Sequence, residues 1–512
     1  MDDHFRSLRI RSRLMGKASH ILPSMEAMMR IPRQETAINR SEGHPLHQKF
    51  SIFNWLILYT IGLILPFIYL SLVLLSGIPV ESAEESGKYI SPAVGLLTTG
   101  ALAVQVDGQW QPLTERLPGY PYFLALLYWF FGQDNHTAIA IVQCFIGGLI
   151  VVGIALVARA IRPSWTWPAG LLAAFWPNLQ LRTSILMPEL IFVLFLVWGL
   201  AGCLWAVRRK PAVGLLCGAG ILFGLAFITR PAMLYFPLFA LPPFIHLVRK
   251  ETCLSWGKSL LLAFLPFLIM WSMATPQLLR TYHHLGEAAY STQSGEHALF
   301  WTYQCLNVPL GCGNRDPQRM DQTARLLQHR LSNLTPEQRQ NPIVVNRVKH
   351  GLAMELVRNI PIPQLISAVL GAATKLLLQN SFYEVMTRFG ETEAILYPRL
   401  SQASILDMPS RLLEFIQDAS QNGWMRIWLL FTIFLLVSRA IQVSGLLLGI
   451  ATPPLQARLL FIVSSSFNFV FVSLGIGNPR YRAPFEPALV ILTVAGWSLL
   501  WHRYRYGKLL AA

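Results

Sequence analysis

The stretch Phe53–Ile78, FNWLILYTIGLILPFIYLSLVLLSGI, decides the fold of this chain. It carries no charged side chain, and it exceeds the ~20 apolar residues that a helix needs to cross the ~30 Å hydrocarbon core of a bilayer. Similar windows recur along the 512 residues, of which 53% are hydrophobic and 13% charged. Soluble domains carry about 25% charged residues. We therefore expect an all-α polytopic membrane protein.

The segment before this stretch, Met1–Lys49, is polar, and its basic side chains outnumber its acidic ones. The positive-inside rule therefore predicts that this N-terminal tail is cytoplasmic. We assign residues 1–50 to this basic tail. The first apolar run is too long for the central region of a signal peptide and lacks a small-residue cleavage site after it. We expect this run to stay in the membrane as a signal anchor.

The formal net charge of +16 reflects topology rather than nucleic-acid binding, because the basic side chains gather in short loops between apolar runs. The run Gly119–Gly132 is too short to cross comfortably, and we interpret it as a re-entrant or juxtamembrane helix. With that interpretation, three basic clusters fall on the cytoplasmic side, as the positive-inside rule requires. These clusters are Arg159 with Arg162, Arg208 to Lys210, and Arg249 with Lys250.

The pattern predicts an all-α bundle of about ten membrane-spanning helices, with juxtamembrane helices and an extracytoplasmic domain between the spans. An N-terminal module, 51–274, precedes a polar, α-rich outer domain, 275–422, and C-terminal spans follow in 423–512. In the outer domain we expect helices at Ile343–Asn359 and Pro361–Leu378. The spans after the first are expected at Ala138–Ala158, Trp167–Leu179, Glu189–Val207, Ala212–Ile228, Ala232–Leu247, Leu260–Ala274, Trp424–Ile450, Leu459–Ile476 and Ala488–Trp501.

The loop Pro79–Pro118 follows the first span and is predicted to be extracytoplasmic. It contains Glu84 and Glu85, and a helix from there would place Glu85 and Tyr89 on one face, four residues apart. A carboxylate at the bilayer edge is partly desolvated, which raises its proton affinity toward the range useful for a general base. The alternative for either glutamate is a solvated loop acid.

Several arginines are predicted on the same outer side, against the positive-inside trend, and their planar guanidinium groups suit phosphate. They are Arg116, Arg230, Arg480 and Arg482. Glu189 opens a predicted span directly after Pro188, where an acid also stabilises a helix N-terminus. Carboxylates and arginines at one face, flanked by lipid, favour a phosphate-bearing lipid as the ligand.

Six cysteines are present, and only Cys305 and Cys312 fall in the predicted outer domain. They could form a disulfide in an oxidising compartment, or remain two free thiols. No Cys/His spacing resembles a zinc site, so we expect no metal and no cofactor.

Five motifs occur in an order that resembles one family of membrane enzymes. They are Glu85-Ser86-Gly87-Lys88-Tyr89, Arg116-Leu117-Pro118-Gly119-Tyr120-Pro121, Trp176-Pro177 with Met187-Pro188-Glu189, Thr229-Arg230-Pro231, and Arg480-Tyr481-Arg482-Ala483-Pro484. In this order they resemble the GT-C glycosyltransferases of the dolichyl-phosphate-mannose-protein mannosyltransferase-like and aminoarabinose-transferase-like group. The resemblance covers most of the chain from Phe53 to Trp501.

The resemblance implies an inverting transfer of a hexose or pentose from a polyprenyl-phosphate sugar to a hydroxyl of a glycan, lipid or protein acceptor. It further implies an active site outside a membrane, here a bacterial inner membrane, with a role in the cell envelope. The family usually has aspartate as the first-loop base, where this chain has Glu85, with Glu84 beside it. The implied substrate-binding residues are Tyr89, Arg116, Tyr120, Glu189, Arg230, Arg480, Tyr481 and Arg482.

Two other functions use similar features. A polysaccharide polymerase or ligase would also place arginines beside a lipid carrier, but would rely on a large outer loop rather than a first-loop acid. A transporter of lipid-linked glycans would need broken helices and charges at the membrane midplane. The predicted charges cluster at one face and no internal repeat is evident, which disfavours transport.

Overall fold

The computed structural model describes residues 50–81, 86–208, 212–308, 317–378, 457–473 and 479–509, with scattered positions between 430 and 448. The contacts below lie within one compact unit, Leu56–Ala512. The long helices are α4 (Ile52–Leu75), α7 (His136–Ile161), α10 (Glu189–Arg208), α11 (Val213–Thr229), α12 (Phe236–Thr252), α13 (Trp256–Leu285), α24 (Ala457–Phe471) and α25 (Glu486–Leu509).

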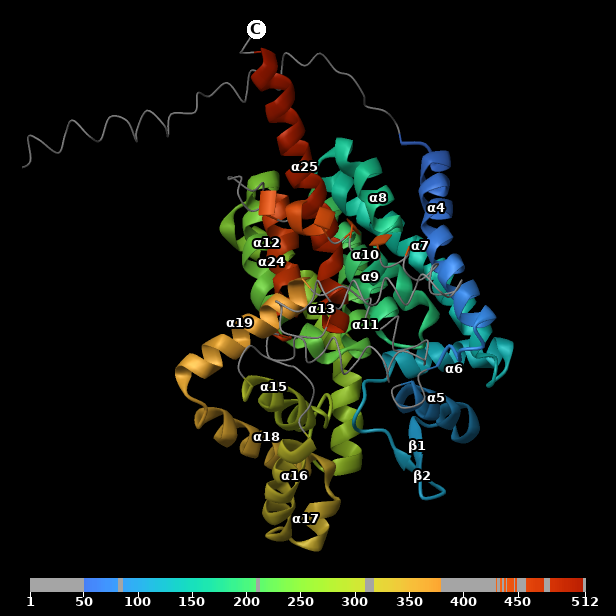
Figure 1. Cartoon of the computed structure of the whole chain (residues 1–512), viewed down its shortest axis with the longest axis vertical. Coiled ribbons are helices and arrows are strands. Elements are labelled where there is room, and N and C mark those ends of the chain that lie inside the picture. Colours follow the sequence, from blue (N-terminus) through green and yellow to red (C-terminus); the bar gives the residue numbers. More distant parts are fainter. Residues whose placement is uncertain are drawn as a thin grey trace, which may run out of the picture. The chain divides into compact units, whose positions relative to one another are not determined.

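Shorter elements connect these helices (Figure 1). Between α4 and α13 they are α5 (Gly87–Thr99), β1 (Ala103–Val106), β2 (Gln109–Pro112), α6 (Gly119–Phe131), η1 (Pro163–Trp165), α8 (Thr166–Ala174), α9 (Pro177–Gln180), η2 (Leu181–Ser184) and η3 (Pro231–Tyr235). After α13 come α14 (Ser294–His297), the π-helical η4 (Ala298–Tyr303), α15 (Gln304–Leu306), α16 (Pro317–Ser332), α17 (Pro336–Gln340), α18 (Pro342–Arg358) and α19 (Ile362–Leu378), and η5 (Pro479–Phe485) precedes α25.

The prediction of an all-α membrane protein is confirmed. Within the described part of the chain, six helices are long and apolar enough to cross a membrane, and α11 and α24 are shorter apolar helices. The helices predicted at Ile343–Asn359 and Pro361–Leu378 appear as α18 and α19, and that predicted at Gly119–Gly132 appears as α6. Most of the predicted span Trp424–Ile450 lies outside the described residues.

The predicted continuous span Trp167–Leu179 is wrong. Helix α8 ends at Ala174, and Trp176 adopts an extended backbone (φ −84°, ψ 103°) before α9 begins at Pro177. A residue that precedes proline is disfavoured in the α region, because the proline ring clashes with its backbone. Apolar composition therefore suggested one helix where Pro177 enforces a break.

Close helix packing in the bundle depends on small residues. Helix α10 packs against both α7 and α11, and α11 packs against α13. A Cβ atom at Gly220 of α11 would lie 2.8 Å from the carbonyl oxygen of Pro266 in α13. Such approaches bring helix backbones together in lipid, where packing rather than water exclusion drives association.

Strands β1 and β2 form an antiparallel hairpin that pairs Val106 with Gln109. Its tip is Asp107-Gly108, with φ of 48° and 79°, as a two-residue turn with left-handed backbone requires. Strand β1 packs on α5, which also packs against α6 (Figure 1). Asp107, an acid of the predicted outer loop, therefore lies exposed at the turn.

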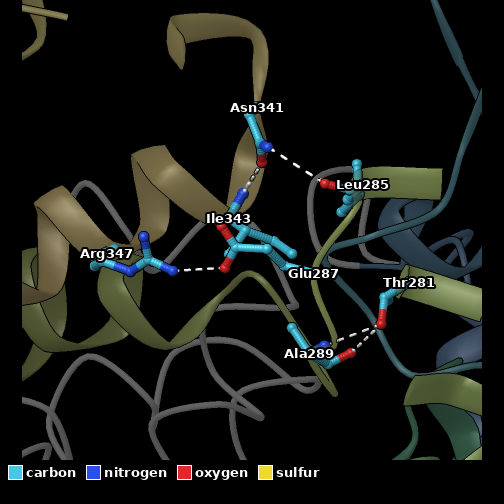
Figure 2. Close-up of polar contacts among 7 residues, drawn as sticks. All are labelled: Thr281, Leu285, Glu287, Ala289, Asn341, Ile343 and Arg347. Atoms are coloured by element: carbon cyan, nitrogen blue, oxygen red, sulfur yellow. Dashed lines mark hydrogen bonds and ion pairs between the residues drawn. The ribbon is translucent and has the colours of Figure 1, made fainter. Parts of the chain in front are cut away.

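Helix α13 continues eleven residues beyond the span predicted to end at Ala274, and it leads into the segment with α14 to α19. Figure 2 shows how the end of α13 is tied to α18. Arg347 pairs with Glu287 at 2.6 Å. Asn341 caps α18 by accepting the Ile343 N–H (3.0 Å) and donates to the carbonyl of Leu285 at 3.5 Å. The outer segment is thus held to the helix that leads into it.

Candidate functional site

The predicted base residues Glu84 and Glu85 lie outside the described residues. The described chain on either side is anchored. Before the gap, Glu81 pairs with His136 at the start of α7, at 3.0 Å. After it, Ser86 is fully buried and precedes α5.

The structure brings two motif residues of the first loop together. Arg116 donates from Nη1 to the hydroxyl of Tyr89 at 3.3 Å, and its guanidinium centre lies 5.2 Å from the centre of the Tyr89 ring. Tyr89 is buried in α5, whereas Arg116 is half-buried. Arg116 Nε is buried and has no hydrogen-bond partner among the described residues, so this guanidinium keeps a donor for a further acceptor.

The segment that carries Arg116 is fixed from the other side by the end of α13 and the linker after it. Arg280 donates to the carbonyl of Leu113. The Thr292 N–H donates to the carbonyl of Thr114 at 3.2 Å, and the Ser291 hydroxyl donates to the carbonyl of Glu115. Hydrogen bonds to the backbone carbonyls of the three residues before Arg116 therefore fix the backbone from which its side chain extends.

Tyr120 lies at the start of α6 and is fully buried. Its ring meets the Tyr89 ring edge-on, with the centroids 5.4 Å apart. Its hydroxyl donates to Gln143 Oε1 of α7 at 2.9 Å, and Gln143 donates in turn to the carbonyls of Thr183 (2.8 Å) and Ile185 (2.9 Å). Burial, followed by the charge of Glu189, raises the pKa of the Tyr120 phenol well above its ordinary value. Tyr120 therefore remains a neutral donor.

Gly119 sets the position of this group relative to α11. A Cβ atom there would lie 2.7 Å from Thr229 Oγ1 and 2.8 Å from the carbonyl oxygen of Ile228. Glycine is therefore the residue that lets the start of α6 meet the end of α11. Arg230 follows directly after α11, so this contact brings the start of α6 close to Arg230.

Glu189 and Arg230, predicted from separate motifs, form an ion pair at 3.1 Å. The Glu189 side chain is 1% exposed and that of Arg230 15%. Glu189 is the first residue of α10, and Arg230 follows α11 in an extended conformation before Pro231. The Arg230 guanidinium also lies 5.5 Å from the centre of the Tyr481 ring. Three of the five motifs thus meet at one point.

Arg482 lies in a separate, buried network. Its side chain is fully buried, pairs with Glu486 four residues later and donates to the carbonyl of Leu376. Glu486 also accepts from the Trp176 indole at 2.5 Å and from Asn178. The network joins η5 to the break between α8 and α9, so Arg482 is already engaged by a carboxylate. The side chain of Arg480 lies outside the described residues.

The sequence analysis missed two buried charges at this end of the bundle, Glu486 and Arg182. The spacing of four residues between Arg482 and Glu486 was a signal for an ion pair on one helical face. Arg182 follows an apolar segment, where a buried charge indicates a structural or functional role.

No group of three or more His, Cys, Asp or Glu side chains that could hold a metal ion occurs within the described ranges. Cys305 is disulfide-bonded, while Cys312, its predicted partner, lies outside the described residues.

The arrangement offers two arginines, Arg116 and Arg230, each beside a tyrosine ring, and one carboxylate, Glu189, which is paired with Arg230. The carboxylate balances one of the two positive charges, so the site favours an anion. Hydroxyl and aromatic surfaces next to the arginines suit a ligand in which a phosphate adjoins an apolar or sugar portion.

One family model of known proteins matches part of this chain. Residues 112–273 match the family model of dolichyl-phosphate-mannose-protein mannosyltransferase. That segment runs from the end of the hairpin into α13 and contains Arg116, Tyr120, Glu189 and Arg230. No curated protein matches the chain.

Two solved structures are similar to this chain. The oligosaccharyltransferase of Archaeoglobus fulgidus in the apo form is 12% identical, with a TM-score of 0.50 over 90% of this chain and 52% of its own. ArnT from Cupriavidus metallidurans bound to undecaprenyl phosphate is 14% identical, with a TM-score of 0.39 over 87% of this chain and 78% of its own. This chain therefore spans about half the length of the oligosaccharyltransferase.

The resemblance drawn from the five motifs is confirmed: the chain has the fold of the GT-C membrane glycosyltransferases.

Proposed function

We propose that this protein transfers a sugar from a polyprenyl-phosphate donor to an acceptor hydroxyl on the extracytoplasmic face of a membrane, with inversion. The observation that carries the proposal is the close approach of Gly119 to the end of α11, which brings the group of Arg116 and Tyr120 toward the ion pair of Glu189 and Arg230. The matched family is named for dolichyl-phosphate-mannose, which is a polyprenyl-phosphate sugar.

The proposed reaction needs a base, a phosphate site and a positioned sugar. Glu85, or Glu84 beside it, takes the proton of the acceptor hydroxyl while that oxygen attacks the anomeric carbon. The bond between the anomeric carbon and the phosphate oxygen breaks through an oxocarbenium-like state. The bonding electrons stay on the phosphate oxygen, and polyprenyl phosphate leaves.

Arg116 and Arg230 are proposed to hold the phosphate. Its charge grows as the bond to the sugar breaks, so cations already in place stabilise the transition state more than the bound donor. Arg116 retains the buried Nε donor described above. Arg230 is held against Tyr481 and paired with Glu189, so it is ordered before substrate arrives.

Glu189 is proposed to orient Arg230 and, through it, the donor. Its 1% exposure and its ion pair make it a poor candidate for the base, because an acceptor hydroxyl must reach the base directly. Arg480 and Arg482 remain predicted ligands of the lipid phosphate. The engagement of Arg482 by Glu486 favours a supporting role for Arg482.

The orientation in the membrane is also a proposal. The helix ends that carry Arg159, Arg208 and Arg249 belong to α7, α10 and α12. If these ends are cytoplasmic, as their charge indicates, Glu189 and Arg230 at the opposite ends of their helices face outside.

Sugar transfer by the purified protein tests the proposal. The wild type, Glu85→Gln and the double variant Glu84→Gln/Glu85→Gln are supplied with polyprenyl-phosphate sugars and total membrane acceptors. We expect transfer by the wild type and its loss in the double variant. Full activity of the double variant would show that the base assignment is wrong. Arg230→Gln is measured beside them. If it loses transfer while the double variant keeps it, the proposed donor site is supported and the base is another residue.

A further inference from the structure

Three arginines gather at the end of the bundle that lies away from Glu189. Arg208 is the last residue of α10, whose first residue is Glu189. Arg159 lies in the last turn of α7, and Arg458 lies in the first turn of α24. Helices α7 and α10 are both long and apolar enough to cross a membrane. The end at which these arginines meet is therefore the level where hydrocarbon gives way to lipid headgroups.

Hydrogen bonds hold two of these arginines next to each other. Arg208 donates from Nη1 to the carbonyl of Arg159 at 3.2 Å, and Arg458 donates from Nη1 to the carbonyl of Ala160 at 3.0 Å. Successive carbonyl oxygens of an α-helix lie about 3.5 Å apart, as its rise and turn per residue require. The two Nη1 atoms are therefore within about 10 Å of each other.

A single carboxylate accompanies these three guanidinium groups. Glu251, near the end of α12, pairs with Arg458 at 2.5 Å, and the two side chains are 24% and 17% exposed. The charges of Arg458, Arg159 and Glu251 all act on Arg208. We call these four residues the basic cluster. Three positive charges against one negative give it a net charge of +2.

Helix capping explains where the two bonded guanidinium groups lie, but not their excess charge. The last carbonyls of a helix have no partner within it, and cationic side chains near that end are stabilising. The end of α7 is equivalent to only about half a negative charge. Most of the positive charge of the basic cluster is therefore left to attract a further anion.

An indole ring lies beside the basic cluster. The Arg208 guanidinium centre is 5.7 Å from the centre of the Trp205 ring. The Trp205 N–H donates to the carbonyl of Leu156 of α7 at 3.3 Å. Tryptophan is enriched where a membrane meets water. All three arginines are half-buried rather than fully buried, so the cluster is partly accessible at the level of the headgroups.

We propose that the basic cluster binds the phosphodiester headgroup of an anionic phospholipid. Lipid phosphate is the anion that a bilayer supplies at this level, and its two non-bridging oxygens suit the planar donor fork of arginine. Basic pockets between membrane-spanning helices bind such headgroups. A zwitterionic headgroup brings its own cation and leaves the excess charge unbalanced, so phosphatidylglycerol is favoured over phosphatidylcholine. This site lies at the opposite end of α10 from Glu189 and does not depend on the proposed sugar transfer.

Lipid titration tests the headgroup site. Delipidated, full-length protein in a neutral detergent is titrated with pyrene-labelled phosphatidylglycerol, and separately with phosphatidylcholine that carries the same chains and label. Energy transfer from tryptophan to pyrene gives a dissociation constant for each lipid, and their ratio is the headgroup selectivity. Each basic side chain near a membrane surface contributes about fivefold to the binding of anionic lipid. A net charge of +2 therefore predicts a selectivity of about 25-fold for the wild type.

Four variants locate the selectivity. Arg208→Gln should lower it about fivefold, whereas Arg208→Lys keeps the charge and should retain most of it. Glu251→Gln removes the competing carboxylate and should raise the selectivity about fivefold, an increase that a purely structural ion pair would not produce. Arg249→Gln/Lys250→Gln removes two exposed charges from the end of α12 and is the matched control, with an expected change below about twofold. Thermal unfolding in detergent confirms that each variant is folded.

Three results would overturn the proposal. Equal dissociation constants of the wild type for the two lipids would exclude a site for anionic headgroups. A loss of selectivity in Arg249→Gln/Lys250→Gln as large as that in Arg208→Gln would show that net charge alone attracts the lipid. Displacement of phosphatidylglycerol by millimolar glycerol phosphate would show that the cluster takes a soluble phosphate instead of a lipid.

Discussion

Replacing Arg230 with glutamine is expected to destabilise the protein by about 3 kcal/mol, because the change removes the cation that is paired with the buried carboxylate of Glu189. Breaking a buried ion pair by removing one partner typically costs about 3–5 kcal/mol. The Arg230 side chain keeps 15% exposure, against 1% for Glu189, so water partly screens the pair and the lower end of that range applies.

The companion variant Glu189→Gln is expected to cost less, about 1–2 kcal/mol. Arg230 is the more exposed partner and still lies against the Tyr481 ring, which stabilises a cation. The double variant Arg230→Gln/Glu189→Gln replaces both charges with neutral amides, so neither member of the pair is left as a charge facing a neutral partner. We therefore expect it to be more stable than Arg230→Gln alone, with a coupling energy of about 2 kcal/mol.

Thermal unfolding followed by tryptophan fluorescence in detergent measures this cycle, with all four proteins in one lipid and buffer. Arg325→Gln is a suitable control, since Arg325 pairs with Asp321 on an exposed face and such pairs contribute little. If the two single changes are additive, Glu189 and Arg230 are not coupled, and the account of the site as a preorganised ion pair is refuted.

Three further changes test the surrounding structure. Gly119→Ala should destabilise the protein by about 1–3 kcal/mol and abolish transfer, because its Cβ would meet the end of α11; Gly214→Ala, where a Cβ meets open space, should raise or preserve the midpoint of thermal unfolding. Glu486→Gln should cost about 3–5 kcal/mol by removing the carboxylate that is paired with the buried guanidinium of Arg482. A midpoint of thermal unfolding equal to that of the wild type would contradict the buried network. Tyr120→Phe should reduce the loss of stability that occurs above about pH 10. Because burial raises the pKa of the Tyr120 phenol, this group stabilises the folded state below the pKa of the unfolded chain, and that contribution falls as the pH rises from the unfolded pKa toward the folded one. If the variant and the wild type lose stability equally at alkaline pH, the burial of Tyr120 is contradicted.

The sequence predicted residues at helix boundaries better than it predicted their partners. Pro188-Glu189 and Arg230-Pro231 are local signals, because proline fixes the backbone at the start of one helix and the end of another. That Glu189 and Arg230 form one ion pair depends on how α10 packs against α11, which local spacing does not specify. The contact between Arg230 and Tyr481 joins residues far apart in the chain and was likewise not predictable.

Two predictions considered one local signal and overlooked another. The span Trp167–Leu179 was predicted from its apolar composition, although Pro177 breaks the helix. Arg482 was predicted to bind an anion, although Glu486, four residues later, is its ion-pair partner. The base assignment to Glu84 or Glu85 remains a prediction.

The end of α13 and the linker after it bond to two partners at once. Arg280, Ser291 and Thr292 hold the segment before Arg116, and Leu285 and Glu287 hold α18. One segment therefore joins α18 to the backbone that carries Arg116. If an acceptor docks on the outer segment and moves α18, acceptor and donor binding become thermodynamically linked, each changing the affinity for the other by the same factor. Such an enzyme would release its spent lipid carrier at a rate that depends on acceptor concentration.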